Sequence, residues 1–352
     1  MKRVALIPGD GIGIEVTRQA ARVIEVLRAD GAPIEITEFD FGADRYLRTG
    51  VAITDAEMAR LETGFDAIFL GAMGDPRIED NAHARAILLG LRFRLDLFIN
   101  LRPVRLLDPA LSPLRNVATE DIDMVIFREN TEGVYVGMGG QHRKGTSQEV
   151  AIQEDINTRH GVERIIRAAF EYAETRGRRS VTLTDKANAM PHAGDLWRRT
   201  FAAVAREYPE IGNRAVYADA LALDLVLHPA RYDVIVAPNL FGDLLSDLAA
   251  AIAGGLGIAP SANLHPGRPG LYEPVHGSAP DIAGTDRANP IAAILTVALM
   301  LENLGQHAEA RRVEVAVEQA IRERRITPDL GGTLGTEEVG DWICERIAQT
   351  GR

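Results

Sequence analysis

The stretch RAVYADALALDLVLHPARYDVIVAPNLFGDLLSDLAAAIA, residues 214–253, decides the fold class. It contains two short apolar runs, at 214–217 and 233–237, and each is followed by apolar residues at helical spacing, at 220–227 and 240–253. A short apolar run bounded by turn residues indicates a buried strand, whereas apolar residues three and four apart indicate a helix. Strands that alternate with helices in this way predict an α/β fold with a largely parallel sheet.

The same alternation extends to both sides of this stretch. Further strands are predicted at 3–7, 34–41, 66–70, 123–127 and 180–183, and further helices at 14–29, 84–95, 162–174, 196–207, 291–304, 308–322 and 337–348. The region 136–156 interrupts the alternation with MGGQHRKGTSQEV followed by the alternating pattern EVAIQEDI. This pattern favours a protruding hairpin arm, and a flexible surface loop is the alternative.

Composition excludes several classes of protein. A chain of 352 residues is long enough for two domains, and 39 basic against 50 acidic residues give a net charge of −11, which argues against a nucleic-acid-binding surface. A single cysteine excludes an internal disulfide and a cysteine-based metal centre. No apolar run is long enough for a membrane span, and the first one, residues 4–7, is too short for a signal peptide. We therefore expect a cytoplasmic protein without a membrane partner.

The glycine turn GDGIG, residues 9–13, follows a predicted strand and opens a predicted helix, as a dinucleotide-binding fingerprint does. The fingerprint G-x-G-x-x-G requires a sixth glycine, and Ile14 stands at that position. A standard Rossmann fold is therefore not expected, although helix N-termini attract phosphate groups and a cofactor near this turn remains open.

Acidic residues suggest a site for a divalent cation. Asp243 and Asp247 are four residues apart in a helical pattern, so both carboxylates lie on one face of the helix, one turn apart. Hard oxygen ligands of this kind suit Mg²⁺ or Mn²⁺, and Asp219, which follows a predicted strand, is a third candidate. Two solvated acids on an exposed helix face are the alternative.

Basic and polar residues near the ends of predicted elements suggest an anion site and proton transfer. Arg92, Arg102 and Arg128 are placed to grip a dicarboxylate through bidentate contacts. Lys186 in TDKAN becomes a candidate base if a cation lies nearby, and Tyr135 in ENTEGVY is a candidate proton donor. Taken singly, an arginine is more often a solvated surface charge, and the lysine and the tyrosine are more often structural.

The loop EPVHGSAPDIAG, residues 273–284, is dense in glycine, proline and small residues. Such a loop can wrap a nucleotide, with Asp281 accepting hydrogen bonds from ribose hydroxyls and repelling a 2′-phosphate. An ordinary structured loop is the alternative.

Together these segments resemble the β-decarboxylating dehydrogenases, the isocitrate/isopropylmalate dehydrogenase family. The motifs that carry the resemblance run in order along nearly the whole chain: IPGDGIGIEV, NLRPVR, RENTEGVY, TDKAN, NLFGDLLSD, EPVHGSAPDIAG and TPDLGGTLGT. The resemblance implies two α/β domains in the family's own arrangement. Residues 1–100 and 255–352 would form a large cofactor-binding domain, and residues 101–254 a domain for substrate, metal and dimerisation, with the arm near 136–156.

The resemblance also implies roles for individual residues. Lys186 and Tyr135 match the general base and acid, and Asp219, Asp243 and Asp247 match the metal ligands, with Asp219 and the lysine serving the other subunit of a homodimer. The remaining matches form two sets. The substrate set is Arg92, Arg102, Arg128, Leu88, Leu89 and Asp219, and the cofactor set is Asn188, His276, Gly277, Ser278, Ala279, Asp281, Ile282 and Asn289. The acid at 281 predicts NAD as cofactor, together with Mg²⁺ or Mn²⁺. A K⁺ requirement and pairing of dimers into tetramers stay open.

The substrate is expected to be a (2R)-malate with a substituent at C3. Leu88 and Leu89 resemble the apolar pair that receives an isopropyl group, which favours 3-isopropylmalate and a role in leucine biosynthesis. Arg85 stands where isopropylmalate dehydrogenases usually carry an acid, and residues 145–165 resemble the tartrate/D-malate branch. D-malate or tartrate, and isocitrate or homoisocitrate, are therefore alternatives. A non-catalytic regulatory subunit is a remote one, because the three aspartates, the lysine and the tyrosine are all present.

Overall fold

The computed structural model describes residues 1–350, which fall into two compact units. Unit 1 comprises Met1–Leu97, Arg105–Thr119 and the chain from Ala250 onward, and unit 2 comprises Phe98–Val104 and Glu120–Ala249. The chain thus enters unit 2 twice and returns to unit 1 each time. Residues 105–119, which the sequence had placed in the middle domain, group with unit 1.

Unit 1 is built on a sheet of five strands in the order β2-β1-β3-β12-β11. Their bounds are β1 Lys2–Ile7, β2 Ile34–Glu38, β3 Ala67–Leu70, β11 Pro260–Leu264 and β12 Gly270–Pro274. All neighbouring pairs are parallel except β11 and β12, which are antiparallel. Residues 4–7 of β1 and all of β3 are apolar and buried on both faces, as expected for parallel strands covered by helices.

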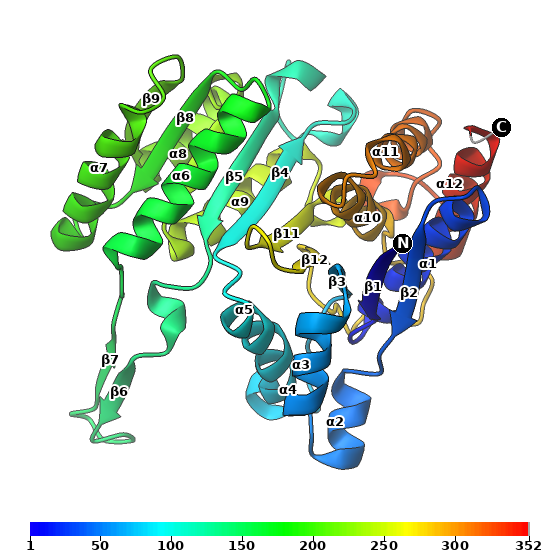
Figure 1. The fold of residues 1–352 in the computed structure, drawn as a ribbon, viewed down its shortest axis with the longest axis horizontal. Coiled ribbons are helices and arrows are strands. Elements are labelled where there is room, and N and C mark those ends of the chain that lie inside the picture. The colour runs from blue at the N-terminus through cyan, green and yellow to red at the C-terminus, as the bar shows by residue number, and fades with distance from the viewer. Residues whose placement is uncertain (351–352) are drawn as a thin grey trace. The chain divides into compact units, whose positions relative to one another are not determined.

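Helices cover both faces of this sheet (Figure 1). One group packs together and consists of α1 (Ile12–Ala29), α10 (Ile291–Asn303), α11 (His307–Arg322) and α12 (Thr336–Thr350). The other group includes α2 (Ala43–Thr49) and α3 (Asp55–Gly64). Met58 and Leu61 of α3 pack with Ala5, Ile7 and other alternate residues of β1 and β3 in one core cluster. Because alternate residues of a strand point to opposite faces, the sheet separates two layers of helices.

The helix predicted at 84–95 forms in three parts. They are α4 (Ala82–Ala84), a π-helical turn (Arg85–Leu89) and α5 (Gly90–Arg94). Apart from Arg92, the buried residues of this stretch recur every four positions, at His83, Ile87, Leu91 and Leu95. In a regular α-helix a step of four residues overshoots one turn by about 40°. The wider π-helical turn offsets this drift and keeps the four side chains on the buried side.

Unit 2 contains the strands in the order β4-β5-β10-β8-β9. Their bounds are β4 Ile99–Arg105, β5 Asp123–Glu129, β8 Ser180–Asp185, β9 Gly212–Tyr217 and β10 Val234–Ala237, and β5, β10, β8 and β9 pair in parallel. Figure 1 shows α6 (Arg159–Thr175) and α7 (Pro191–Ala205) over one face, with α8 (Ala218–Leu227) and α9 (Asn239–Ala253) behind the sheet. The α/β alternation expected from residues 214–253 is confirmed by β9, α8, β10 and α9.

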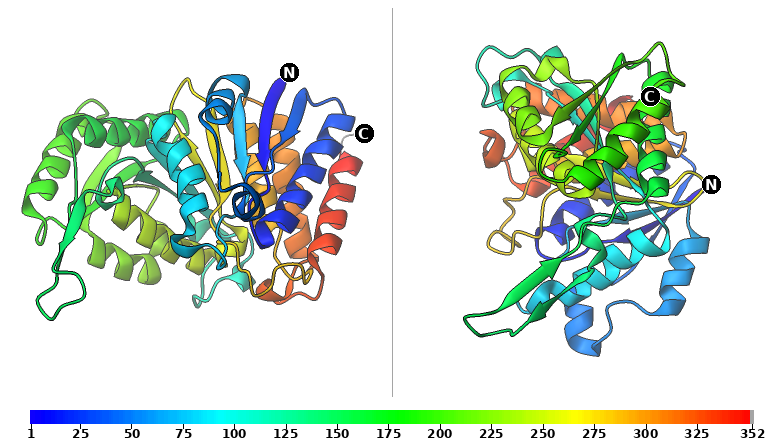
Figure 2. Two further views of the ribbon diagram at one scale, coloured as in Figure 1. Left: turned by 90° about the horizontal axis from the view of Figure 1, so that it is seen from below. Right: turned by 90° about the vertical axis from the view of Figure 1, so that its left-hand side faces the viewer.

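A hairpin projects from unit 2, and its strands are β6 (Gly139–His142) and β7 (Val150–Gln153). The two strands are antiparallel, and every residue in them is exposed. Figures 1 and 2 show the hairpin extending away from the helices and strands of its unit. The protruding hairpin expected from the sequence is therefore present.

Several elements were missed in the sequence, and their residues explain why. The strands β4, β11 and β12 carry proline or buried polar residues such as Asn100 and Asn263, so none reads as an apolar run. The helices α2 and α3 were not predicted, and β2 ends at Glu38 rather than at residue 41. Short 3₁₀ turns complete the structure at Glu79–Asn81, Pro109–Leu111, Thr119–Asp121, Val134–Val136, Pro229–Arg231, Leu256–Ile258 and Pro328–Leu330. No helix among residues 1–350 combines the length and the apolar character that a membrane crossing needs.

Candidate active site

In unit 2, three predicted site residues converge on one carboxylate near the start of α9. Arg102 donates from Nη2 to Asp243 Oδ1 at 3.2 Å, and Arg128 donates from Nη1 to the same oxygen. The Tyr135 hydroxyl donates to Asp243 Oδ2 at 2.8 Å. The structure thus brings together two of the arginines, the candidate acid and one of the candidate metal ligands.

Asp247 lies one turn further along α9 and shares Arg102 with Asp243. Arg102 Nη1 donates to Asp247 Oδ1 at 3.0 Å and to Ser246 Oγ at 2.6 Å. Burial raises the pKa of the Asp247 carboxyl, and repulsion from Asp243 adds to this against the attraction of Arg102. A divalent cation would relieve that repulsion, so the chemistry of this carboxylate pair fits a hard metal ion.

Arg128 is held in place from several sides. Its side chain is almost fully buried, and its Nε donates to the backbone and side-chain oxygens of Asn239 at 3.0 and 2.9 Å. Its guanidinium lies 5.0 Å from the centre of the Tyr135 ring. A Cβ added at Gly242 would lie 2.7 Å from the Arg128 side chain, so glycine is required for α9 to approach this arginine. The guanidinium is therefore fixed in orientation before any ligand binds.

Lys186 and Asp219 form a separate pair. Lys186 Nζ lies 2.7 Å from Asp219 Oδ1, and this contact lowers the pKa of the Asp219 carboxyl. Within residues 1–350, no group of three or more His, Cys, Asp or Glu side chains is arranged to hold a metal ion. The predicted ligands Asp243 and Asp247 lie together, whereas Asp219 pairs with the lysine, and the resemblance assigns both of those residues to the site of another subunit.

The turn that carries Lys186 is anchored by its neighbour Asp185. The Asp185 carboxylate accepts two hydrogen bonds from Arg198, at 2.7 and 2.9 Å, and one from the backbone N–H of Ala187 at 3.0 Å. The Arg198 guanidinium also lies 4.7 Å from the centre of the Tyr217 ring, directly before α8. The chain segments that carry Lys186 and Asp219 are therefore tied to the same arginine.

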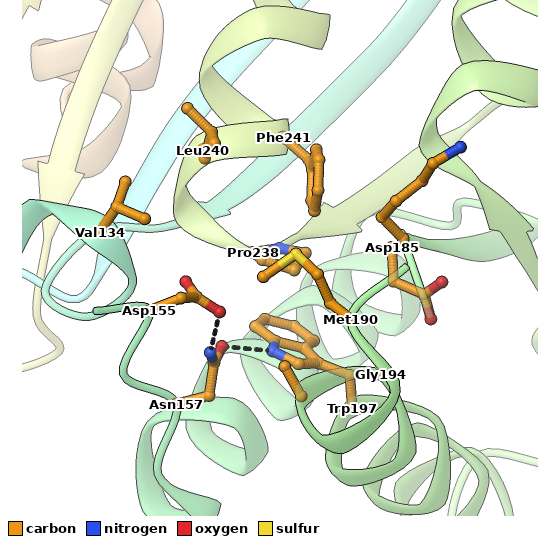
Figure 3. Close-up of a pocket in the computed structure, with 12 residues that line it drawn as sticks. Val134, Asp155, Asn157, Asp185, Met190, Gly194, Trp197, Pro238, Leu240 and Phe241 are labelled. Atoms are coloured by element: carbon orange, nitrogen blue, oxygen red, sulfur yellow. Dashed lines mark hydrogen bonds between the residues drawn. The ribbon is translucent and has the colours of Figure 1, made fainter. Parts of the chain in front are cut away.

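A pocket lies beside Lys186 in unit 2 (Figure 3). Its lining residues are Val134, Asp155, Asn157, Asp185, Lys186, Met190, Ala193, Gly194, Trp197, Pro238, Leu240 and Phe241. Figure 3 shows Asn157 between Asp155 and Trp197, where it donates to Asp155 at 2.6 Å and accepts from the indole N–H at 2.8 Å. The wall next to the lysine is therefore mainly apolar, with its polar atoms already paired.

In unit 1, the predicted cofactor loop leaves a histidine nitrogen without a partner. His276 Nδ1 donates to the carbonyl of Gly277 at 3.0 Å, whereas Nε2 is buried and no hydrogen-bond partner lies within the described residues. Burial lowers the pKa of His276, so the ring stays neutral and Nε2 is an acceptor. Ala279 has a φ of 35°, and Asp281 is exposed, with Ile282 half-buried beside it. An orphaned acceptor and an exposed acid fit a loop that binds a nucleotide.

Two residues of the predicted cofactor set have other surroundings. The Asn289 side-chain carbonyl accepts from the backbone N–H of Ile291, the first residue of α10, at 3.0 Å, and its amide donates to Asp329 at 3.0 Å. Asn188 is exposed in the turn after Lys186. Asp329 was missed in the sequence, because an acid in the segment TPDLGGTLGT carries no distinctive spacing.

The predicted substrate residues of unit 1 lie on the helical stretch 82–94. Arg92 is buried and donates to Glu273 at 2.9 Å, and its Nε is buried without a partner in the described chain. Leu88 and Leu89 are half-buried, and Leu88 packs on the core cluster of the unit, whereas Arg85 is exposed. Glu273 is the acidic first residue of the cofactor loop, and its pairing with Arg92 was not predicted.

Comparisons with known proteins agree over the full length of the chain. Residues 3–343 match the family model described as isocitrate/isopropylmalate dehydrogenase. The chain is 47% identical over 347 residues to a protein of Streptomyces griseus named 3-isopropylmalate dehydrogenase, with 98% of each chain covered. A protein of the same name from Corynebacterium jeikeium is 49% identical over 348 residues, which cover 98% of this chain and 99% of that one.

A solved structure supports the same placement. The crystal structure of isocitrate dehydrogenase from Methylococcus capsulatus superposes with a TM-score of 0.91 at 37% identity. The match covers 99% of this chain and 100% of the other. The resemblance identified from the sequence motifs is confirmed by these matches.

Proposed function

Because the chain belongs to the isocitrate/isopropylmalate dehydrogenase family, we propose that it oxidises and decarboxylates 3-isopropylmalate with NAD as the electron acceptor. The product is 2-oxo-4-methylpentanoate, and the pathway is leucine biosynthesis. The substrate assignment rests on curated relatives of that name, which are 46–49% identical over the whole chain.

The observation that carries the proposal is the convergence of Arg102, Arg128 and Tyr135 on Asp243, with Asp247 one turn away. Two fixed guanidinium groups provide a bidentate grip for a carboxylate of malate. A phenol hydroxyl beside them is placed to pass a proton. The family resemblance adds Arg92 as a third carboxylate ligand, and its unpartnered Nε is a donor that a carboxylate would satisfy.

Each residue then has one task in the reaction. The arginines orient the malate so that C2 gives its hydride to NAD while Lys186 takes the proton of the 2-hydroxyl group. The resulting β-keto acid loses its β-carboxylate as CO₂. Tyr135 supports delivery of a proton to C3 of the remaining enol. General acid–base catalysis of this kind contributes about 10²- to 10⁴-fold to a rate.

Asp243 and Asp247 would hold Mg²⁺ or Mn²⁺, joined by Asp219 of a second subunit. When bound, such an ion acts as a Lewis acid on the substrate oxygens. Burial raises the pKa of the Asp247 carboxyl, and a bound cation would favour its charged form. Lys186 and Asp219 serve the same neighbouring site, so the functional assembly is a homodimer that shares its active sites. The hairpin β6–β7 is its expected clasp.

The cofactor loop is assigned to NAD rather than NADP. His276, Gly277, Ser278, Ala279 and Ile282 would line the nucleotide, and the exposed Asp281 would accept hydrogen bonds from ribose hydroxyls. A carboxylate at this position repels a 2′-phosphate. Asn289 and Asn188 complete the set by resemblance, and the protein is expected to act in the cytoplasm.

The proposal is tested by NADH formation with Mn²⁺ or Mg²⁺ against 3-isopropylmalate, D-malate, tartrate, isocitrate and homoisocitrate. We expect kcat/KM for 3-isopropylmalate to exceed every other value at least about tenfold, since one apolar pocket discriminates neighbours by about 1–3 kcal/mol. A preference for D-malate or tartrate would move the protein to that branch and contradict the assignment.

Isocitrate and homoisocitrate form the second candidate, and Arg85 is the observation that favours them. Its guanidinium is exposed on the π-helical turn that also carries Leu88 and Leu89, where it offers a charge to an anionic C3 substituent. The substitution Arg85→Glu separates the candidates. It should leave turnover of 3-isopropylmalate within about threefold, whereas an isocitrate-type enzyme would lose at least about tenfold in kcat/KM.

A further inference from the structure

The glycine turn at residues 9–13 packs against other backbone rather than forming an open cradle. A Cβ at Gly9 would overlap the carbonyl oxygen of Ala72, and a Cβ at Gly11 would overlap that of Ser278. A Cβ at Gly13 would lie 2.7 Å from Ala72 N. The backbone N–H of Ile12 donates to the Ser278 carbonyl at 2.8 Å. The turn is therefore in direct backbone contact with the cofactor loop at Ser278.

Asp10, the acid inside this turn, accepts hydrogen bonds from three donors on separate segments. Its Oδ1 accepts from the backbone N–H of Ala43, the first residue of α2, at 2.6 Å. Its Oδ2 accepts from the backbone N–H of Gly74 and from His83 Nε2, both at 2.8 Å. The side chain is only 4% exposed, so each of these bonds lies in a low-dielectric interior. One carboxylate thus joins the turn, α2, the loop after β3 and the helical stretch 82–94.

His83 is the polar member of an apolar row. It occupies the same buried side as Ile87, Leu91 and Leu95, and its side chain is fully buried. Because Nε2 faces a carboxylate, Nε2 carries the proton, and Nδ1 is buried without a partner in the described chain. A leucine would fill this position without leaving an orphaned nitrogen. The bond to Asp10 is what the histidine adds.

The same helical stretch presents Leu88, Leu89 and Arg92, the residues assigned to the substrate. Its N-terminal end is tied to Asp10 through His83, and Asp10 lies between Gly9 and Gly11 in the turn that supports the Ser278 loop. The substrate-binding helix and the cofactor loop are therefore braced against one turn. A displacement of His83 would release Asp10 and the turn around it, and the cofactor loop that contacts the turn at Gly11 and Ile12 would shift with the turn.

We propose that Asp10 and His83 are positioning residues that hold the cofactor loop and the substrate-binding helix of unit 1 in a common register. Neither touches substrate or cofactor. The inference rests on the proposed function for the identity of the ligands, and on the hydrogen bonds of Asp10 for the positioning role. Its consequence is that loss of the His83–Asp10 bond weakens the binding of both ligands together and changes the chemical step less.

The test compares His83→Leu with His83→Gln, and with Tyr46→Phe as a control. Glutamine retains a side-chain N–H at about the reach of Nε2, whereas leucine removes it. The Tyr46 ring lies 5.9 Å from that of His83, so the phenylalanine variant alters the same neighbourhood and keeps the bond to Asp10. NADH affinity is measured by fluorescence titration, KM and kcat by initial rates, and backbone protection of residues 71–84 and 275–284 by hydrogen–deuterium exchange.

For His83→Leu we expect the Kd for NADH and the KM for substrate each to rise roughly tenfold, with kcat within about threefold. Protection is lost in both segments, His83→Gln recovers most of each value, and Tyr46→Phe matches the unaltered protein. Unchanged constants, or a rise confined to one ligand, would overturn the proposal. The same holds for a lower melting temperature without any change in KM. Hydrogen exchange and NADH titration do not depend on which malate the enzyme turns over. A wrong substrate assignment is therefore distinguishable from a wrong positioning role for Asp10 and His83.

Discussion

Asp10 in unit 1 and Asp243 in unit 2 each accept hydrogen bonds from three separate groups, and the donors differ in kind. Asp10 is buried and accepts from two backbone N–H groups and an imidazole N–H. Asp243 is about one-third exposed and accepts from two guanidinium groups and a phenol. Asp10 lies in the turn between β1 and α1, whereas Asp243 lies in the first part of α9, which follows β10.

The donors decide which carboxylate is free to exchange partners. Backbone N–H groups are fixed by the fold, and no ligand can replace the acceptor they point at without unfolding that segment. By contrast, we expect the fixed guanidinium groups to donate to a carboxylate of the substrate while the Asp243 carboxylate turns to a cation. We therefore expect Asp10 to act as a structural acid and Asp243 to take part in the proposed reaction.

The comparison is tested most strongly by the same substitution at both positions. Asp243→Asn should lower kcat/KM by about 10²- to 10³-fold, because it removes a charge that the reaction uses. It should change the free energy of unfolding by less than about 1 kcal/mol, since the site is open to solvent. Asp10→Asn should instead lower that free energy by about 1–3 kcal/mol, because an amide cannot accept from all three donors.

Chemical denaturation with initial-rate kinetics on both variants provides the measurement. If Asp243→Asn loses as much stability as Asp10→Asn, or if Asp10→Asn folds normally and loses only activity, the distinction between a structural and a chemical carboxylate fails.

A smaller effect is expected where the glycine turn meets the cofactor loop. Gly11 has a φ of 53° and its Cβ position coincides with the Ser278 carbonyl, so Gly11→Ala should destabilise unit 1 by about 3 kcal/mol. Gly277→Ala is the matched change in the same loop, since a Cβ there meets open space and its φ is not positive. Thermal unfolding should show a clear drop for the first variant and a shift within about 0.5 kcal/mol for the second. Equal melting temperatures would contradict the packing role of the turn.

The smallest effect concerns a charge pair that is structural alone. Arg45 donates two hydrogen bonds to Glu57 of α3, at 2.7 and 2.8 Å, and lowers the pKa of Glu57 to about 2. The folded pKa lies below the ordinary value of 4.5, so the pair stabilises the fold above pH 4.5 and this is lost as the pH falls toward 2. Glu57→Gln should cost about 1 kcal/mol at neutral pH, because solvent screens the pair.

Unfolding measured from pH 7 to pH 2 should therefore show a shallower acid dependence for Glu57→Gln, with kcat unchanged. A pH profile parallel to that of the unaltered protein would show that the pair contributes nothing.

Elements with a single dominant pattern were predictable, and those with mixed patterns were not. The run VIVA of β10 and the spacing of apolar residues in α9 predict one structure each, and both form. The strand β4 contains Arg102 and Pro103, and β12 contains Glu273. These residues interrupt the apolar run that predicts a buried strand, so neither strand was predicted. The π-helical turn follows from packing within unit 1, which no local sequence pattern predicts.

Within the candidate site, contacts between residues at a regular helical spacing could be predicted from the sequence. Asp243 and Asp247 are one helical turn apart, and their pairing follows from that number alone. The bond between Arg92 and Glu273 joins residues 181 positions apart in the chain, and Asp10 and His83 are 73 apart. Such contacts depend on the order of strands in the sheet, which the sequence does not state.

The backbone contacts of the glycine turn also limit how this enzyme can be redesigned. At Gly9, Gly11 and Gly13 any side chain meets main-chain atoms that cannot move aside. A library that varies the turn would therefore consist mostly of unfolded proteins. In the loop that the turn contacts, Asp281 is exposed and Ile282 is half-buried. If the proposed NAD assignment of this loop holds, a change of coenzyme should be sought at those two positions, with the glycines left untouched.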